Sequence, residues 1–153
     1  MNNKITITKT TSENPDFIHL ITAFDGYLWA KYPELKTNYW GNNIIEINPN
    51  VVLIYLDDKA VACGCFKKYD SDTVEIKRMF VSPEARGMGI AQKILQELEF
   101  LAAQKGYSYA VLETLFKQTA AIALYQKVGY AIVDNYEPYV GLENSVCMRK
   151  QLK

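Results

Sequence analysis

Three short strand-like segments follow one another directly, and this succession constrains the fold more than any other feature of the chain. Residues 51–56 are apolar and β-branched, and 60–68 and 73–81 follow after tight turns at 57–59 and 70–72. Strands joined by such short connections pair antiparallel. The sequence therefore predicts an antiparallel meander as the central part of a sheet.

Further strands and helices are predicted on both sides of the meander. Residues 4–9 alternate like a strand, and Asn14-Pro15 opens a helix whose apolar residues recur at helical spacing. A strongly amphipathic helix follows residue 89 and ends near Gly106. The remaining segments are a strand at 109–114, a helix at 119–128 and strands at 130–133 and 145–151. Hairpins and strand-helix-strand crossovers both occur, which predicts an α/β fold with a mixed, mostly antiparallel sheet flanked by helices.

Length, composition and charge limit the classes of protein that this chain can represent. Its 153 residues fit a single domain, 1–153, and 49% hydrophobic with 22% charged residues is ordinary for a globular protein. Lys plus Arg and Asp plus Glu both number 17, so the net charge is zero. A nucleic-acid partner is not expected, because such binders usually carry a basic excess.

The few cysteine and histidine residues do not indicate a metal site or a disulfide framework. Cys63, Cys65 and Cys147 are an odd number, and Cys63-Gly64-Cys65 lacks the spacing of a redox or zinc motif. His19 is the single histidine. The chain shows no apolar run near the ~20 residues that cross a bilayer, and no apolar signal core at its start. We expect a cytoplasmic protein that needs neither a metal nor a membrane.

A glycine-containing loop before the amphipathic helix is the segment that indicates chemistry. A helix start leaves backbone N–H groups unpaired and favours anions, and glycines let a ligand approach the backbone closely. A diphosphate fits this description, with an arginine adding positive charge. The P-loop pattern is broken by Ile90-Ala91, and the dinucleotide pattern by Gln92. The loop reads Arg86, Gly87, Met88, Gly89, Ile90 and Ala91.

This hexad resembles the R/Q-x-x-G-x-G/A loop of the GCN5-related N-acetyltransferase (GNAT) family. The preceding strand, 75–81, is similar to the fourth strand of that family, and 121–130 (AIALYQKVGY) resembles its A-x-x-L-Y-x-K-x-G-F/Y segment. The two blocks lie in the order and spacing of the family. The resemblance implies a GNAT-type sheet with a splayed central strand pair. It also implies an acetyl-CoA-dependent N-acetyltransferase.

The resemblance also implies roles for individual residues. Residues 86–91 would hold the pyrophosphate of acetyl-CoA mainly through backbone N–H groups, and Tyr125 would protonate the departing thiolate. The family often carries Asn seven residues before that tyrosine, where this chain has Gln118, so the contact of Gln118 with the cofactor is in question. The backbone of one strand segment would bind the pantetheine arm, like an added strand: Met79, Phe80 and Val81.

The pattern of that strand independently predicts an irregularity. Val74 and Ile76 share one face, but polar Lys77-Arg78 interrupts the alternation, and an apolar run follows. A β-bulge near 77–79 explains the break, and bulges are frequent beside active sites. The family has a bulge at this place, where it separates two strands to admit the cofactor.

A carboxylate is the best candidate for the general base that deprotonates the acceptor amine. Glu75 matches the position where some family members carry this base, and the alternative is that Glu75 pairs with Lys67 or Lys77 across the sheet. Glu113 is a second candidate, for which a solvated carboxylate at a strand end is the favoured interpretation. Tyr125 lies on the apolar stripe of its helix, so pattern alone indicates a core tyrosine, whereas the family match favours the thiolate acid.

The sequence says less about the acceptor of the acetyl group than about any other part of the reaction. Aromatic residues gather early and late in the chain, where the family places its acceptor site, and they would suit a small organic amine. The alternative, favoured for at least half of them, is that they cover the core. A protein amine is the second candidate acceptor. A different kind of function, a non-catalytic acyl-CoA sensor, is the alternative to an enzyme. The family allows a homodimer. The aromatic residues are Tyr27, Trp29, Tyr32, Tyr39 and Trp40 in the early group, and Tyr136 and Tyr139 in the late group.

Overall fold

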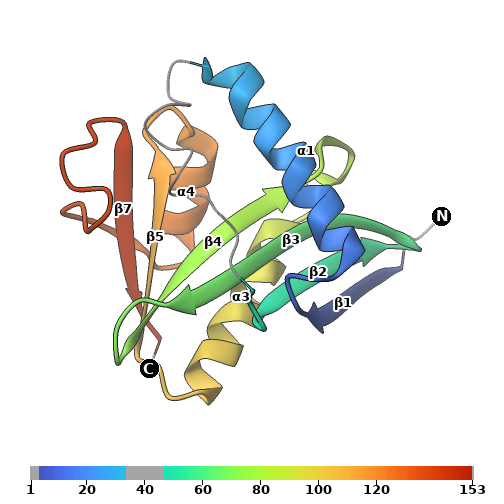
Figure 1. The fold of residues 1–153 in the computed structure, drawn as a ribbon, viewed down its shortest axis with the longest axis horizontal. Coiled ribbons are helices and arrows are strands. Elements are labelled where there is room, and N and C mark those ends of the chain that lie inside the picture. The colour runs from blue at the N-terminus through green and yellow to red at the C-terminus, as the bar shows by residue number, and fades with distance from the viewer. Residues whose placement is uncertain (1–3, 34–46, 153) are drawn as a thin grey trace. The chain divides into compact units, whose positions relative to one another are not determined.

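The computed structural model of the chain describes residues 4–33 and 47–152 (Figure 1). Two compact units make up the chain. The first unit comprises Met1–Cys65 and Arg78–Leu98, and the second comprises Phe66–Lys77 and Glu99–Lys153. The strand β4 (Thr73–Val81) and the helix α3 (Ile90–Gln104) each contribute residues to both units. The single domain expected over 1–153 stays a prediction.

Seven strands form one sheet in the order β1-β2-β3-β4-β5-β7-β6. The neighbours β4 and β5 are parallel, whereas β1–β2, β2–β3, β5–β7 and β6–β7 are antiparallel. This arrangement confirms the predicted mixed, mostly antiparallel sheet. The other strands are β1 (Ile5–Thr10), β2 (Val51–Leu56), β3 (Lys59–Lys68), β5 (Tyr109–Leu115), β6 (Ala131–Val133) and β7 (Ser145–Gln151).

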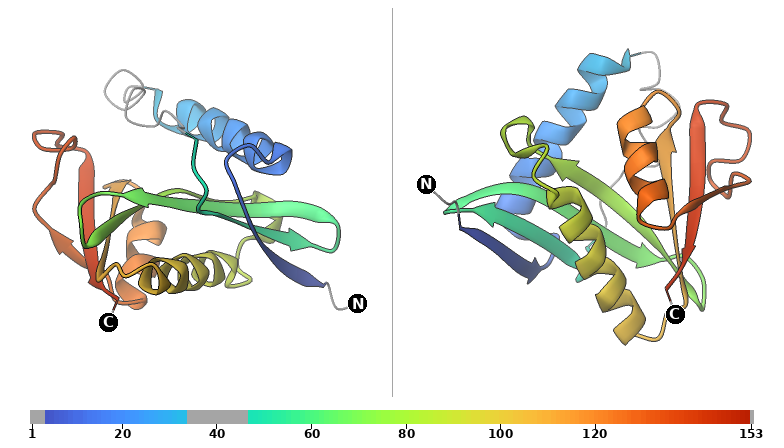
Figure 2. Two further views of the ribbon diagram at one scale, coloured as in Figure 1. Left: turned by 60° about the horizontal axis from the view of Figure 1, so that its bottom comes forward. Right: turned by 180° about the vertical axis from the view of Figure 1, so that it is seen from behind.

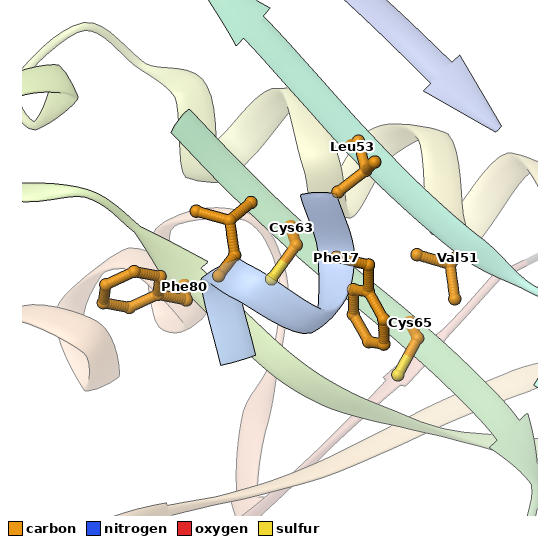
Figure 3. Packing of buried hydrophobic residues seen from close by; sticks show 7 residues of the cluster. Phe17, Val51, Leu53, Cys63, Cys65 and Phe80 are labelled. Carbon is orange, nitrogen blue, oxygen red and sulfur yellow. The ribbon is translucent and has the colours of Figure 1, made fainter. Parts of the chain in front are cut away.

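Helix α1 (Pro15–Lys31) covers one face of the first unit's strands. It begins where the sequence predicts, because the Asn14 side chain accepts a hydrogen bond from the backbone N–H of Asp16 at 2.8 Å. Its buried residues pack on alternate residues of β2 and β3, which share a face because side chains along a strand alternate. Figure 3 shows this cluster, which consists of Phe17, Leu20, Val51, Leu53, Cys63, Cys65 and Phe80.

Helix α3 lies on the opposite face of these strands (Figure 2, left view). Gly64 of β3 marks the contact, because a side chain there would meet Ile94 and Leu98 of the helix and Met79 of β4. The predicted end of the helix is confirmed at Gly106, whose φ of 94° is easily reached only by glycine. The two helices therefore enclose the strands of the first unit.

The second unit contains the antiparallel strands β5, β7 and β6 and the helix α4 (Thr119–Lys127). The chain leaves α4 through Gly129, whose φ is 107°. The Tyr130 hydroxyl then donates to Glu99 at 2.9 Å, and Lys150 pairs with the same carboxylate at 2.8 Å. These contacts tie α3, the segment that follows α4, and β7 together within this unit.

Strand β4 is interrupted at Arg78, whose φ of 58° lies in the left-handed region. This conformation is uncommon for a residue with a side chain, and it agrees with the irregularity predicted at 77–79. Parallel pairing joins Thr73–Glu75 of β4 to Tyr109–Val111 of β5, although both strands continue beyond these residues. The parallel register between the two strands thus ends before the irregularity at Arg78.

We expect Gly64→Ala to destabilise the protein by about 1–3 kcal/mol, because overpacking forces neighbouring side chains out of place. The added Cβ would lie 2.7 Å from Cγ2 of Ile94 and 2.7 Å from Sδ of Met79. Urea unfolding followed by circular dichroism measures the effect. Gly26→Ala is the matched control, because Gly26 lies in α1 with nothing within 4 Å. The control should gain about 0.5–1 kcal/mol in the helix, and equal stability changes for both variants would contradict the close approach at Gly64.

Candidate active site

The glycine loop before α3 has the conformation that the sequence predicts. Gly87 and Gly89 have φ angles of 80° and 73°, and α3 starts directly afterwards at Ile90. The first N–H groups of a helix have no partner within the helix, so this loop presents donors to an anion. Gly87, Met88 and Gly89 are exposed, whereas Ile90 is buried under the helix.

Arg86 precedes these glycines and is held by two contacts in the first unit. Its Nε donates to the carbonyl of Val81 at 3.1 Å, and its guanidinium lies 5.2 Å from the ring centroid of Tyr27. The side chain is exposed. An exposed guanidinium with a restrained position provides positive charge beside the loop.

The segment predicted to bind pantetheine turns two of its side chains into the first unit. Met79 points its sulfur at Gly64, and Phe80 stacks on Phe24 of α1 with ring centroids 5.2 Å apart. Phe80 is only 7% exposed. A ligand along this segment would therefore meet its backbone, in which the Val81 carbonyl already accepts from Arg86.

Glu75 is buried in the second unit, with 3% of its surface exposed. The Tyr136 hydroxyl donates to Oε2 of Glu75 at 2.8 Å. Nζ of Lys67 lies 3.9 Å from Oε1, at the outer limit of an ion pair. The cross-sheet pair with Lys67 therefore exists but is long, and the tighter partner, Tyr136, follows 61 residues later in the chain. No local sequence signal indicates that contact.

Glu113 is half-buried on β5, so the interpretation as a solvated strand-end carboxylate is wrong. The register with β7 places Glu113 opposite Cys147, inside the sheet, and Ser145 donates its hydroxyl to the Glu113 carboxylate at 2.7 Å. Burial raises the pKa of Glu113 to about 7, and the charge of Glu75 adds to the rise. The Ser145 hydrogen bond and the charge of Lys77 oppose it.

Tyr125 is 8% exposed and packs its ring against Tyr130 with centroids 6.0 Å apart. Burial, and then the charge of Glu113, raise the pKa of Tyr125 to about 12, so the hydroxyl keeps its proton at neutral pH. Gln118 stands at the N-terminal end of α4, where its amide oxygen accepts from the Thr114 hydroxyl at 3.4 Å. The amide oxygen thus accepts one long hydrogen bond within the second unit.

One loop supplies tyrosine hydroxyls to the charged side chains of the second unit. We call residues 134–144 the tyrosine loop; its Asn135 amide donates to the carbonyls of Tyr139 and Leu142, both at 3.2 Å. Tyr136 and Tyr139 meet edge to face, with centroids 5.5 Å apart. Lys77 donates to the Tyr139 hydroxyl at 3.3 Å. The late aromatic group of the sequence therefore lies among the carboxylates.

The early aromatic group is only partly described. Tyr27 lies under Arg86, and Tyr32 is buried, with no hydrogen-bond partner for its hydroxyl among the residues that the structure describes. Tyr39 and Trp40 lie outside the described residues. In the described part of the chain, 4–33 and 47–152, the acidic, cysteine and histidine residues form no group of three suited to a metal ion. Among the same residues, every helix is too short or too polar to span a bilayer.

A model of the acetyltransferase (GNAT) family matches residues 14–130. The chain belongs to this family. A curated GNAT relative, the IAA acetyltransferase of Azospirillum brasilense, is 30% identical over 97% of this chain and 98% of its own length. The structure of an acyl-CoA N-acyltransferase from Klebsiella pneumoniae has a TM-score of 0.78 at 29% identity, covering 99% of this chain and 98% of that protein.

A GNAT acetyltransferase from Elizabethkingia anophelis, solved with acetyl-CoA bound, has the same fold. Its TM-score is 0.67 at 22% identity, covering 96% of this chain and 97% of that protein. These comparisons confirm the resemblance drawn from the two sequence blocks. They also confirm the predicted enzyme class, an acyltransferase, and the GNAT-type sheet.

We predict that Glu113→Gln changes how the stability of this GNAT protein depends on pH. A carboxyl whose pKa is raised from 4.5 to about 7 is costly to ionise in the folded state, so stability falls as pH rises through this range. The raised pKa corresponds to about 3 kcal/mol. The variant should therefore gain stability relative to the natural chain between pH 5 and pH 8.

Urea unfolding at both pH values measures this gain. Glu143→Gln, which changes an exposed carboxylate of the tyrosine loop, is the control and should leave the pH dependence as it is. A stability difference between Glu113→Gln and the natural chain that is equal at pH 5 and pH 8 would show that Glu113 titrates normally.

Proposed function

We propose that this GNAT protein transfers the acetyl group of acetyl-CoA to the primary amine of a small molecule, by direct attack in a ternary complex. The observation that carries the proposal is the group of two carboxylates and a protonated tyrosine in the second unit: Glu75, Glu113 and Tyr125. The names of the relatives agree, since they describe acetyl or acyl transfer.

The binding site of the acetyl donor, acetyl-CoA, is assigned to residues of the first unit. The glycine loop at 86–91 holds the pyrophosphate through its free N–H groups, with Arg86 as a neighbouring charge. The backbone of Met79, Phe80 and Val81 binds the pantetheine arm. Gln118 is a weaker assignment, because its side chain is engaged by Thr114.

Glu113 is the member of the carboxylate pair that accepts the proton of the acceptor ammonium. A base is most effective when its pKa lies near the working pH, and the pKa of Glu113 is about 7. Glu75, the base candidate from the family position, is more deeply buried and already accepts the Tyr136 hydroxyl. Its charge adds to the rise of the pKa of Glu113, so Glu75 supports the base without being the base itself.

Tyr125 is the acid that protonates the leaving thiolate. Its raised pKa means that the hydroxyl still carries its proton at neutral pH when the thiolate forms. The charge of Glu113 contributes to this pKa, so base and acid belong to one electrostatic group. This pairing favours an enzyme over a non-catalytic acyl-CoA sensor, which needs neither proton transfer.

The acceptor is assigned to the tyrosine loop and the carboxylates that it contacts. Tyr136 and Tyr139 offer aromatic faces and hydroxyls beside Glu75. Such walls suit a small amine better than an extended peptide, because they combine packing with cation recognition. A protein amine is the alternative acceptor, and a screen of amines for CoA release separates the two.

Acetyl-CoA and CoA should bind the purified protein with micromolar affinity, whereas ATP should not bind. Gly89→Ala should weaken the binding of both CoA species roughly tenfold or more, because an alanine at a φ of 73° distorts the glycine loop. Isothermal titration calorimetry measures these affinities.

Gly106→Ala is the matched control for this binding experiment. Gly106 also has a positive φ, 94°, and open space around it, but it lies at the other end of α3. The control should lose stability and keep its affinity. A folded natural chain that binds no acetyl-CoA would refute the loop assignment and the transfer reaction with it.

The acidic limb of the rate profile of amine acetylation should have a midpoint near pH 7, where Glu113 loses its proton. Glu113→Gln should abolish this limb and lower turnover at pH 7 roughly 100-fold, in the range of general-base catalysis. Glu75→Gln should move the limb to lower pH, because the charge of Glu75 raises the pKa of Glu113. Steady-state CoA release between pH 5.5 and 9 tests both.

The opposite pattern would assign the base to Glu75. In that case Glu75→Gln abolishes the acidic limb of the rate profile, and the turnover of this variant partly recovers at high pH. Glu113→Gln then still shows an acidic limb. Tyr125→Phe serves as a reference in the same assay, since loss of the acid should slow transfer while acetyl-CoA affinity in the calorimeter stays near that of the natural chain.

A further inference from the structure

Lys77 places a positive charge inside the carboxylate and tyrosine group of the second unit. The side chain is half-buried, and Nζ donates to the Tyr139 hydroxyl at 3.3 Å while lying 6.0 Å from the centroid of that ring. Tyr139 in turn packs against Tyr136, whose hydroxyl donates to Glu75, so printed side-chain contacts lead from Lys77 to a carboxylate of the group. The charge of Lys77 also lowers the pKa of Glu113. An alkylammonium of the chain itself thus lies among the residues assigned to the acceptor.

A fixed cation at this place discriminates between acceptors by their charge. It repels a second ammonium, which disfavours diamines and polyamines, and it attracts a negative group. It also disfavours protonation of the acceptor amine, because like charges nearby lower the pKa of an ammonium. The cation therefore assists the same deprotonation for which Glu113 is the base.

We propose that Lys77 is a specificity-determining residue that selects acceptors carrying a carboxylate beside the primary amine, that is, amino acids or related amino carboxylates. This inference rests on the proposed acetyl transfer and names the class of its acceptor. The acceptor carboxylate binds the Lys77 ammonium, while the acceptor amine faces Glu113. Tyr139 positions Lys77 through its hydroxyl.

Lys77 takes no part in the covalent step. The ammonium of the acceptor gives its proton to Glu113, and the neutral amine attacks the thioester carbonyl. A C–N bond forms, the C–S bond breaks, and the thiolate takes the proton of Tyr125. The attacking nitrogen, which still carries one proton too many for an amide, then gives that proton to the Tyr125 phenolate and restores its hydroxyl. Other charges near the pair are Glu75, which Tyr136 holds, and Lys67, which is half-exposed at 3.9 Å from Glu75.

The test compares acceptors that differ only in the carboxylate. Each of a set of L-amino acids is assayed beside its carboxamide and the corresponding decarboxylated amine, with kcat and KM measured by CoA release. The natural chain, Lys77→Met and Lys77→Arg are compared through the ratio of kcat/KM for the amino acid to that for its carboxamide. Each variant is assayed with the same amino acid and carboxamide. Differences in this ratio between variants therefore do not reflect the intrinsic reactivity of the two amines.

Lys77→Met should lower this ratio roughly tenfold or more, mainly through KM of the amino acid, and Lys77→Arg should largely retain it. The midpoint of the acidic limb should rise in Lys77→Met, because the charge of Lys77 lowers the pKa of Glu113. Lys68→Met, which removes an exposed cation at the end of β3, is the control for both readouts. Lys77→Glu should turn the preference toward diamines.

A ratio that is the same in the natural chain and in Lys77→Met would overturn the inference while leaving acetyl transfer intact. Transfer to the decarboxylated amines alone would do so as well. Acetyl-CoA binding without CoA release for any amine would instead count against the proposed function, so the two failures are distinguishable. Retained circular dichroism and acetyl-CoA affinity of the variants exclude misfolding as the cause.

Discussion

The left-handed backbone at Arg78 is the constraint on which much of this structure depends. Residues before it, Thr73–Glu75, hydrogen-bond to β5, and residues after it bring Phe80 into the core under α1. Inserting an irregularity changes which face of a strand each later residue occupies. The Cys63 thiol donates to the Arg78 carbonyl, and Asp25 pairs with the guanidinium, so local contacts hold the unusual conformation in place.

The fold was predictable because its signals are local. Strands β2, β4 and β7 begin and end where alternation and turn residues place them, and Asn14 caps α1 as its sequence position indicates. The positive φ angles of Gly87 and Gly89 were also predictable, because glycine adopts such angles wherever it stands in a chain. The interrupted alternation at 77–79 was visible for the same reason.

The partners of the carboxylates were not predictable, because they are tertiary contacts. Tyr136 reaches Glu75 across 61 residues and Ser145 reaches Glu113 across 32. Glu113 looks like a solvated strand end when β5 is considered alone; only the pairing with β7 encloses it. Because burial raises the pKa of Glu113, a wrong prediction of its exposure also gives a wrong prediction of its pKa.

The tyrosine loop suggests how such an enzyme could diversify. Its two tyrosines, with Ser145 directly after it, contact three charged side chains that belong to β4 and β5. Asn135 closes the loop on itself through two carbonyls, so the loop is built largely from its own hydrogen bonds. Under the proposed assignment of the acceptor to this loop, exchange of this one short segment in a related gene would change the acceptor, while the strands and the glycine loop stay the same.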